Sequence, residues 1–181
     1  MATSGSADFE LAVDDYIEEA FERCGLEIRT GYDLKTAKRS LNLLFADWAN
    51  RGLNRWTITQ TTTTITDGTT EYTLAADTID VLSAVIRENA GTASQTDTAI
   101  SRIGRDTYLN ISSKLTESRP TQFYIDRQII PKIRLYPTPN ATYSLVYDRL
   151  TRIEDADSAT NTVDVPFRFY PCLTAGLAYY L

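Results

Sequence analysis

Apolar residues recur at helical spacing at both ends of this chain, and a long β-branched stretch separates them. This feature constrains the fold more than any other. The stripes predict one helix over residues 8–24 and a second over 34–51. A third helix is expected to begin near Pro166 or Pro171, because proline fits the first turn of a helix. Each helix has one apolar face that needs a partner, so the three are expected to pack together.

Local signals mark where the first two helices begin and end. Ser6 or Asp8 is the expected N-cap of the first helix, and Asp33 that of the second. Gly25 and Gly52 are expected to stop them, because glycine accepts the backbone conformation that ends a helix. The third stripe continues to Leu181 without a stop signal, so the natural chain is expected to run further.

The stretch from Arg55 to about Thr151 is rich in threonine, tyrosine, isoleucine and valine, which favours strands. Asp67-Gly68 predicts a hairpin between the first two strands, and Pro131 indicates an edge strand or a late start. Residues 89–97 are expected to form a loop, and 101–112 contain a possible short helix. The predicted strands cover 56–66, 71–74, 79–87, 121–126, 129–136 and 142–150, with Leu82, Ala84 and Ile86 on one face of the third.

The predicted fold is therefore of the α+β class. Residues 1–54 and 165–181 are expected to form a small helical bundle. Residues 55–164 are expected to form an inserted antiparallel β module, a sandwich or a barrel-like sheet.

Little in the sequence points to catalysis, so the chain is not expected to be an enzyme. It contains no histidine, which removes the commonest general base, and no glycine-rich phosphate loop. We expect no catalytic residue, no cofactor and no metal centre. Cys24 and Cys172 are expected to be small buried side chains, and a disulfide between them remains open.

Two groups of carboxylates are candidate sites. Three are expected to lie on a solvated helix face: Glu18, Glu19 and Glu22. Four follow the β stretch, namely Glu154, Asp155, Asp157 and Asp164, but the positions that a calcium loop gives to glycine and glutamate hold Thr160 and Pro166. A weak, irregular cation site there remains open.

The net charge of −6 and the pI of about 4.7 do not favour binding of nucleic acid. No apolar run is long enough to span a membrane, so no membrane association is expected. The eleven tyrosines are spread along the chain, which favours protein interfaces over a sugar platform.

The order of several motifs resembles the head-to-tail adaptor, or head-completion, proteins of tailed bacteriophages, particularly short-tailed ones. The first part is the helix ending Glu19-Ala20…Cys24-Gly25-Leu26, followed by Leu41-Asn42-Leu43-Leu44…Asp47-Trp48-Ala49-Asn50-Arg51-Gly52-Leu53-Asn54-Arg55-Trp56. The second part is Arg119-Pro120-Thr121-Gln122-Phe123-Tyr124, then Ile133-Arg134-Leu135-Tyr136-Pro137 and Pro139. Together these cover most of residues 8–150.

The resemblance implies a structural virion protein at the head–tail junction, made in the host cytoplasm. It implies a subunit of a ring, with twelve copies, that docks on the portal protein and links it to a downstream tail or nozzle protein. DNA would pass through this ring without specific binding. The structural core of the family motif would be Leu41, Trp48, Gly52 and Trp56.

Another interpretation remains open: a carbohydrate-binding or cell-wall-active phage protein. Its β module would then stack tyrosine and tryptophan side chains on sugar, or would use two carboxylates for hydrolysis.

Overall fold

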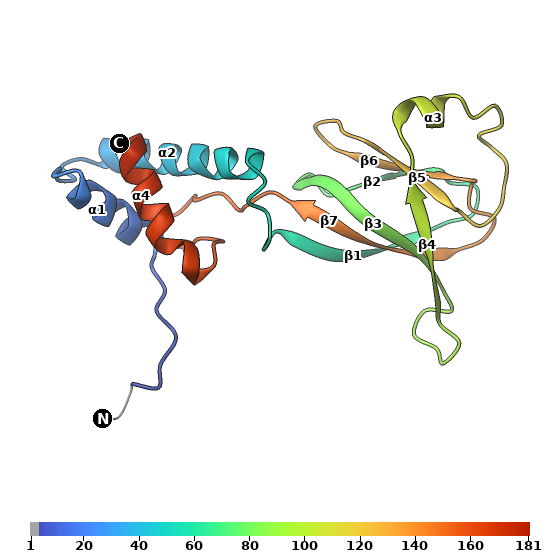
Figure 1. Cartoon of the computed structure of the whole chain (residues 1–181), viewed down its shortest axis with the longest axis horizontal. Coiled ribbons are helices and arrows are strands. Elements are labelled where there is room, and N and C mark those ends of the chain that lie inside the picture. Colours follow the sequence, from blue (N-terminus) through green and yellow to red (C-terminus); the bar gives the residue numbers. More distant parts are fainter. Residues whose placement is uncertain (1–3) are drawn as a thin grey trace. The chain divides into compact units, whose positions relative to one another are not determined.

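The structure is a computed structural model that describes residues 4–181 and confirms the predicted α+β class (Figure 1). Its described residues contain four α-helices and seven strands, with helices at both ends of the chain and the β module between them. The chain divides into two compact units. The helical unit combines the chain up to Trp56 with Ile153–Leu181, and the β unit is Thr57–Arg152.

Helix α1 spans Val13–Arg23, so it begins later than the apolar stripe predicts. Residues 8–11 are not helical, and Ala12 forms a single antiparallel bridge with Thr162. Ala12 is therefore the N-cap, in place of Ser6 or Asp8, and its N–H donates to the Asp15 carboxylate over 2.9 Å. A tertiary contact sets this boundary, which a local pattern does not contain.

Helix α2 spans Gly31–Asn50, and its N-cap is Thr30 rather than Asp33. Thr30 and Asp33 form a reciprocal capping box. The Asp33 N–H donates to the Thr30 hydroxyl over 3.3 Å, and the Thr30 N–H donates to the Asp33 carboxylate over 3.0 Å. Asp33 thus stabilises the helix start from inside its first turn.

The C-terminal segment uses both candidate prolines. Pro166 precedes the 3₁₀ turn η1 (Phe167–Phe169), and Pro171 lies in the first turn of α4 (Tyr170–Tyr180). Helix α4 packs against both α1 and α2. An added Cβ at Gly176 would lie 2.9 Å from Leu44 Cδ2, so α4 approaches α2 closely at this glycine. The helical core buries Val13, Tyr16, Ile17, Ala20, Phe21, Ala37, Leu41, Leu44, Phe45, Trp48, Ile153, Ala156, Val165, Leu173 and Leu177.

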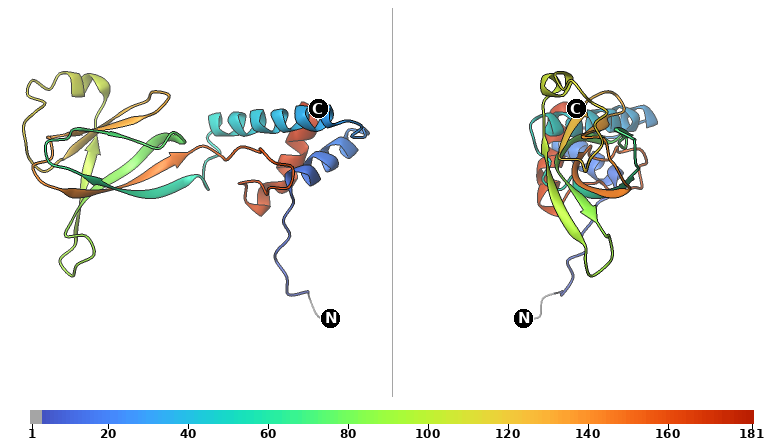
Figure 2. Two further views of the ribbon diagram at one scale, coloured as in Figure 1. Left: turned by 180° about the vertical axis from the view of Figure 1, so that it is seen from behind. Right: turned by 90° about the vertical axis from the view of Figure 1, so that its right-hand side faces the viewer.

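The β unit is one curled sheet with the strand order β1-β7-β3-β4-β5-β6-β2 (Figure 2). Every neighbouring pair is antiparallel except β4 and β5, and the short helix α3 connects these two. The elements are β1 Ile58–Ile65, β2 Glu71–Thr73, β3 Thr78–Glu88, β4 Thr96–Arg102, α3 Arg105–Leu109, β5 Gln122–Asp126, β6 Lys132–Tyr136 and β7 Tyr143–Thr151.

The predicted hairpin at Asp67-Gly68 is wrong. The chain does turn there, since the Thr69 N–H donates to the Thr66 carbonyl over 3.3 Å. However, β1 pairs with β7 and β2 pairs with β6, so the two strands lie at opposite ends of the sheet order. The residues of the turn determine only its local conformation, whereas the pairing of strands depends on contacts across the whole sheet.

Two further expectations for the sheet are corrected. The loop expected over 89–97 ends early, because β4 begins at Thr96. Strand β3 does not bury Leu82, Ala84 and Ile86 together: Leu82 is 49% exposed, whereas Val81, Ala84 and Ile86 are buried. The pairing of β3 with β7 shifts its register between Val81 and Ser83, and such a bulge moves the following side chains to the opposite face.

Of the two effects predicted for Pro131, an edge strand or a late start, the structure shows the late start. Strand β6 begins at Lys132 and lies inside the sheet, between β5 and β2. The Pro131 carbonyl accepts a hydrogen bond from the Leu74 N–H over 2.9 Å, so the proline contributes its acceptor just where it lacks a donor.

Candidate functional site

The four motif residues all belong to the helical unit, where they connect α2 to the segment before α4. Leu41 is fully buried and Trp48 is 8% exposed. The Trp48 ring centroid lies 6.2 Å from that of Phe169. Gly52 has a φ of +80°, and the Leu53 N–H donates to the Trp48 carbonyl over 3.0 Å, which closes α2.

Trp56 completes this connection. Its ring lies 4.8 Å from the ring of Phe169, and its Nε1–H donates to the Asp164 carbonyl over 3.0 Å. These contacts show that Trp48 and Trp56 pack against the segment that precedes α4.

Asn42 is a structural residue for which sequence reasoning assigned no role. Its Nδ2 donates to the Ala156 carbonyl over 3.3 Å, and its Oδ1 accepts from the Ala156 N–H over 2.8 Å. Ile153, Ala156 and Val165 are buried in the helical core. The segment 153–164, which was expected in the β module, therefore belongs to the helical unit and packs with the helices. The sequence signal for this contact was the Leu41-Asn42 pair, in which an amide follows a leucine of the apolar stripe of α2.

An aromatic surface covers part of the helical unit, and we define it by Phe9, Trp56, Phe167 and Tyr170. Phe9 and Phe167 are 61% and 65% exposed, and their ring centroids lie 6.3 Å apart. Phe167 also contacts the Tyr170 ring at 5.5 Å. The four residues line a hollow of about 420 Å³. Exposed rings gathered in this way are typical of protein interfaces.

Beneath this surface, Tyr16 is completely buried. Its ring packs edge-to-face on Tyr170, with centroids 5.4 Å apart. Burial raises the pKa of the Tyr16 hydroxyl, and the neighbouring Tyr170 raises it further. Tyr16 therefore stays neutral and serves packing.

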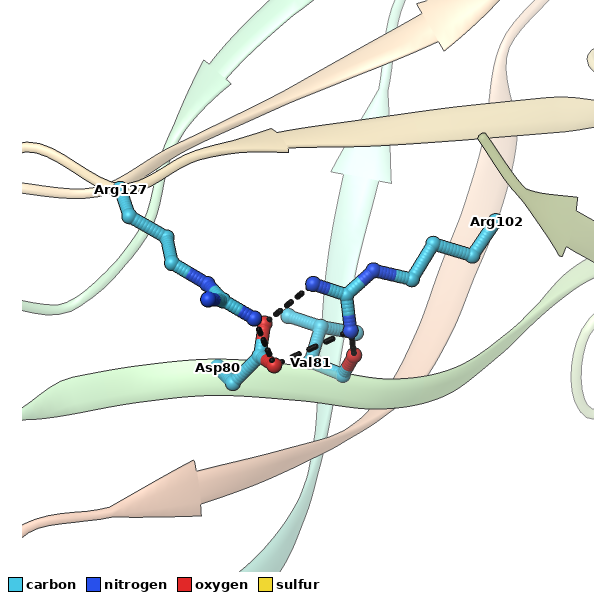
Figure 3. A network of polar contacts seen from close by, with 4 residues as sticks. All are labelled: Asp80, Val81, Arg102 and Arg127. Atoms are coloured by element: carbon cyan, nitrogen blue, oxygen red, sulfur yellow. Dashed lines mark hydrogen bonds and ion pairs between the residues drawn. The ribbon is translucent and has the colours of Figure 1, made fainter. Parts of the chain in front are cut away.

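The β unit contains an ionic network centred on Asp80 (Figure 3). Arg102 donates from both terminal nitrogens to the Asp80 carboxylate, over 3.0 and 2.9 Å, and Arg127 donates over 2.6 Å. Arg102 also donates to the Val81 carbonyl over 3.2 Å. The network thus ties β3, the end of β4 and the loop after β5 together.

Two effects oppose each other on the Asp80 carboxyl. Partial burial raises its pKa, but the hydrogen bonds from Arg102 and Arg127 outweigh burial and hold the pKa below its usual range. The carboxylate is therefore ionised at neutral pH. A shallow cleft of about 340 Å³ adjoins this network, between Arg105, Tyr124 and Asp126.

Apolar side chains project from two loops of the β unit. Ile129 is 96% exposed and Ile130 is 50% exposed, in the loop between β5 and β6 that we call the isoleucine tip. Leu115, in the segment between α3 and β5, is 79% exposed. Large aliphatic side chains in such positions are not buried within the monomer, so they are suited to contact with another protein.

Charge is divided unevenly between the units. The helical unit contains fourteen aspartates and glutamates against eight lysines and arginines, so it carries the whole net charge of −6. The β unit contains ten of each and has no net charge.

The two groups of carboxylates each line a hollow. Glu154, Asp155, Asp157 and Asp164 lie around one of about 270 Å³, and Glu18, Glu19 and Glu22 lie along one of about 430 Å³. Glu18, Glu19 and Glu22 are exposed on α1. Within residues 4–181, no group of three or more possible metal ligands lies together. The Asp157 carboxylate instead accepts hydrogen bonds from the Ser158 N–H and the Asn161 amide, over 2.6 and 2.9 Å.

The expected burial of the cysteines is wrong, because Cys24 and Cys172 are both exposed and both free. Cys24 follows the last turn of α1, and Cys172 lies on the open face of α4. In the part of the chain that the structure describes, no helix combines the length and the apolar character that crossing a membrane requires.

In the carbohydrate interpretation, tyrosine and tryptophan side chains of the β module stack on sugar. Trp48 and Trp56 both belong to the helical unit. In the β unit, Tyr108 stacks on Tyr124, with ring centroids 5.5 Å apart, and both are buried. These rings stack on each other and offer no open platform to a sugar.

A comparison with known families gives one finding that spans both units. The model of a family described as SU10 adaptor protein matches residues 8–181. A comparison with curated proteins gives no match.

Proposed function

Since the chain belongs to the SU10 adaptor protein family, a family of structural adaptors of bacteriophages, we propose that it is one subunit of a ring between head and tail. The ring docks on the portal protein, links it to the tail, and surrounds part of the channel through which DNA passes. The observation that carries this proposal is the family match over residues 8–181, which includes the helices and the inserted sheet together.

The two units offer different surfaces for this role. In the proposal, the helical units pack side by side around the ring, because they present the aromatic surface with Phe9 and Phe167 exposed. The β units dock on neighbouring virion proteins through exposed apolar loops such as the isoleucine tip. The subunit contacts are heterologous, so that rotation can close the ring.

The charge distribution supports passage of DNA without binding. The helical unit carries the net charge of −6, and a negative wall repels phosphate groups. We assign the channel wall to the helical unit on this ground.

The test is a measurement of mass for the protein alone, for purified portal protein, and for their mixture, by sedimentation and native mass spectrometry. The expected result is a complex in which one ring of subunits sits on each portal ring, with twelve copies. A mixture in which the portal binds no subunits would overturn the proposal.

Two variants separate the proposed surfaces. Ile129→Asp should abolish docking on the portal, and Phe167→Asp should reduce the number of subunits per portal. Both residues are exposed, at 96% and 65%, so neither change should unfold the protein. Thr92→Asp, in an exposed turn of the β unit, is the matched control and should assemble as the unmodified chain does.

A further inference from the structure

The sheet of the β unit has two edge strands, and they are protected very differently. Strand β2 has three residues, and its Glu71 is held by Lys132 and Arg134 at 2.6 and 2.8 Å. A short, charged edge resists pairing with another chain. Strand β1 has eight residues, none charged and none proline, and its register with β7 is uninterrupted. It has none of the usual defences of an edge.

The hydrogen bonding of β1 shows which of its backbone groups are free. The Thr151 N–H donates to the Thr57 carbonyl over 2.8 Å, and these two residues continue the β1–β7 register by one position beyond Ile58 and Leu150. Odd-numbered residues of β1 therefore direct their N–H and C=O groups at β7. The even-numbered residues direct theirs away from the sheet, and all four are exposed: Ile58, Gln60, Thr62 and Thr64.

A free row of alternating donors and acceptors is complementary to one kind of partner, an extended strand. A second copy of β1 fits this row. In an antiparallel pair centred on Thr61, Ile58 lies opposite Thr64 of the second copy, and Gln60 lies opposite Thr62. This is the two-fold register in which all four free residues meet free residues. Centring the pair on Gln60 or on Thr62 leaves one of them unmatched.

Charge also favours a second copy at this edge. The β unit has no net charge, so two copies can meet at their sheets without net repulsion. The pair places Thr61 opposite Thr61 and Thr59 opposite Thr63, and threonine pairs are favourable across strands. A β2 edge fits less well, because its bonding to β6 leaves outward groups on Glu71 and Thr73 alone.

We propose that β1 is a pairing strand through which two copies of this chain join their sheets, antiparallel and in register around Thr61. The pair buries both β1 edges and leaves β2 edges outside, so association stops at two. This contact is two-fold, whereas the contacts of the proposed ring are heterologous. The two proposals therefore concern different contacts, and either can fail without the other.

The first experiment uses Thr62→Pro in the complete chain. Because the Thr62 N–H points away from the sheet, proline there removes no bond within the subunit, and edge strands tolerate it. In sedimentation over a rising concentration series, the unmodified protein should form dimers and no larger species. Thr62→Pro should weaken this association by at least about tenfold. Thr62→Ser keeps the N–H and should dimerise normally, and circular dichroism checks that each variant is folded.

The second experiment tests the register. In a protein carrying Cys24→Ser and Cys172→Ser, Thr61→Cys should form a disulfide-linked dimer on mild oxidation. Facing residues of a non-bonded pair have Cα atoms about 4.5 Å apart, which suits a disulfide. Thr63→Cys should not cross-link, because Thr63 would face Thr59. A protein that stays monomeric at every concentration, a proline variant that associates normally, or cross-linking at 63 in place of 61 would each overturn the proposal.

Discussion

Replacing Trp48 with alanine gives the sharpest test of how the helical unit is held together. The indole is 8% exposed and lies between the rings of Phe45 and Phe169, with centroid distances of 6.5 and 6.2 Å. Truncating a buried tryptophan removes its transfer free energy and leaves a cavity, which costs about 3–5 kcal/mol. A small unit has only about 5–15 kcal/mol in total, so a large share of its stability would be lost.

The same cost can be expressed as a melting temperature. In a unit of fewer than 100 residues, each 1 kcal/mol lowers the melting temperature by about 4–8 °C. Trp48→Ala should therefore lower the melting temperature of the helical unit by about 12 °C or more. The β unit should melt as before, because Trp48 belongs to the core of the helical unit and the β unit has a core of its own.

Tryptophan fluorescence separates the two units. Trp48 and Trp56 both lie in the helical unit, and the β unit has no tryptophan, so indole emission reports on the helices alone. In the variant, Trp56 remains as the reporter, and its contact with Phe169 makes its emission sensitive to loosening of this core. Leu43→Ala is the matched control on the same helix, since Leu43 is 57% exposed and should change stability by no more than about 0.5 kcal/mol.

A particular result would refute this reasoning. If Trp48→Ala melted normally but no longer bound a partner such as the portal, Trp48 would be a binding residue rather than a packing residue. Equal losses in Trp48→Ala and Leu43→Ala would show that the helix itself, and not the buried ring, sets the stability.

Three further changes have defined outcomes. Gly52→Ala should cost about 1–2 kcal/mol in urea unfolding, because Gly52 has a φ of +80°, whereas Gly31→Ala should be neutral or stabilising, because Gly31 has ordinary φ and no atom near an added Cβ. The lowered pKa of Asp80 contributes stability that is present above the unfolded carboxyl pKa of about 3.9 and is lost as pH falls through the folded pKa. Urea midpoints of the β unit should show this loss in acid, and Asp80→Asn should start lower at neutral pH and lose less. Cys24 and Cys172 are exposed, so a maleimide should label both in the folded protein, as mass spectrometry would show.

The helices could be predicted from the sequence because their signals are local. The stripe containing Leu41, Phe45 and Trp48 identifies the buried face of α2 without knowledge of its partner. The helix starts were less predictable, because two alternatives compete at each. Asp33 suits an N-cap by composition, but Thr30 three residues earlier completes a capping box and places Asp33 inside the helix.

The order of the strands could not be predicted, because it depends on contacts between distant residues. Strand β1 lies next to β7, the last strand of the chain, and the Asp67-Gly68 turn contains no information about this partner. The bulge near Leu82 also has no local signal, yet it decides which residues of β3 are buried.

The ionic network shows the same limit. Asp80 lies between Ile79 and Val81, where alternation indicates an ordinary strand residue. Arg102 and Arg127 lie far along the chain, and the sheet brings them to Asp80. Packing positions could thus be read from sequence, whereas a site made from three separate segments could not.

Because the helical unit is discontinuous in sequence, it affects the order in which parts of the chain fold during synthesis on the ribosome. Helices α1 and α2 emerge first, but their apolar faces also need α4, which begins at Tyr170. The β unit is contiguous and is complete once Arg152 has emerged. Domains fold as units during synthesis, so the middle of this chain can fold while its beginning still waits for its end. Translation that stalls between Arg152 and Tyr170 would leave a finished sheet attached to two helices with exposed apolar faces, a natural target for chaperones and proteases.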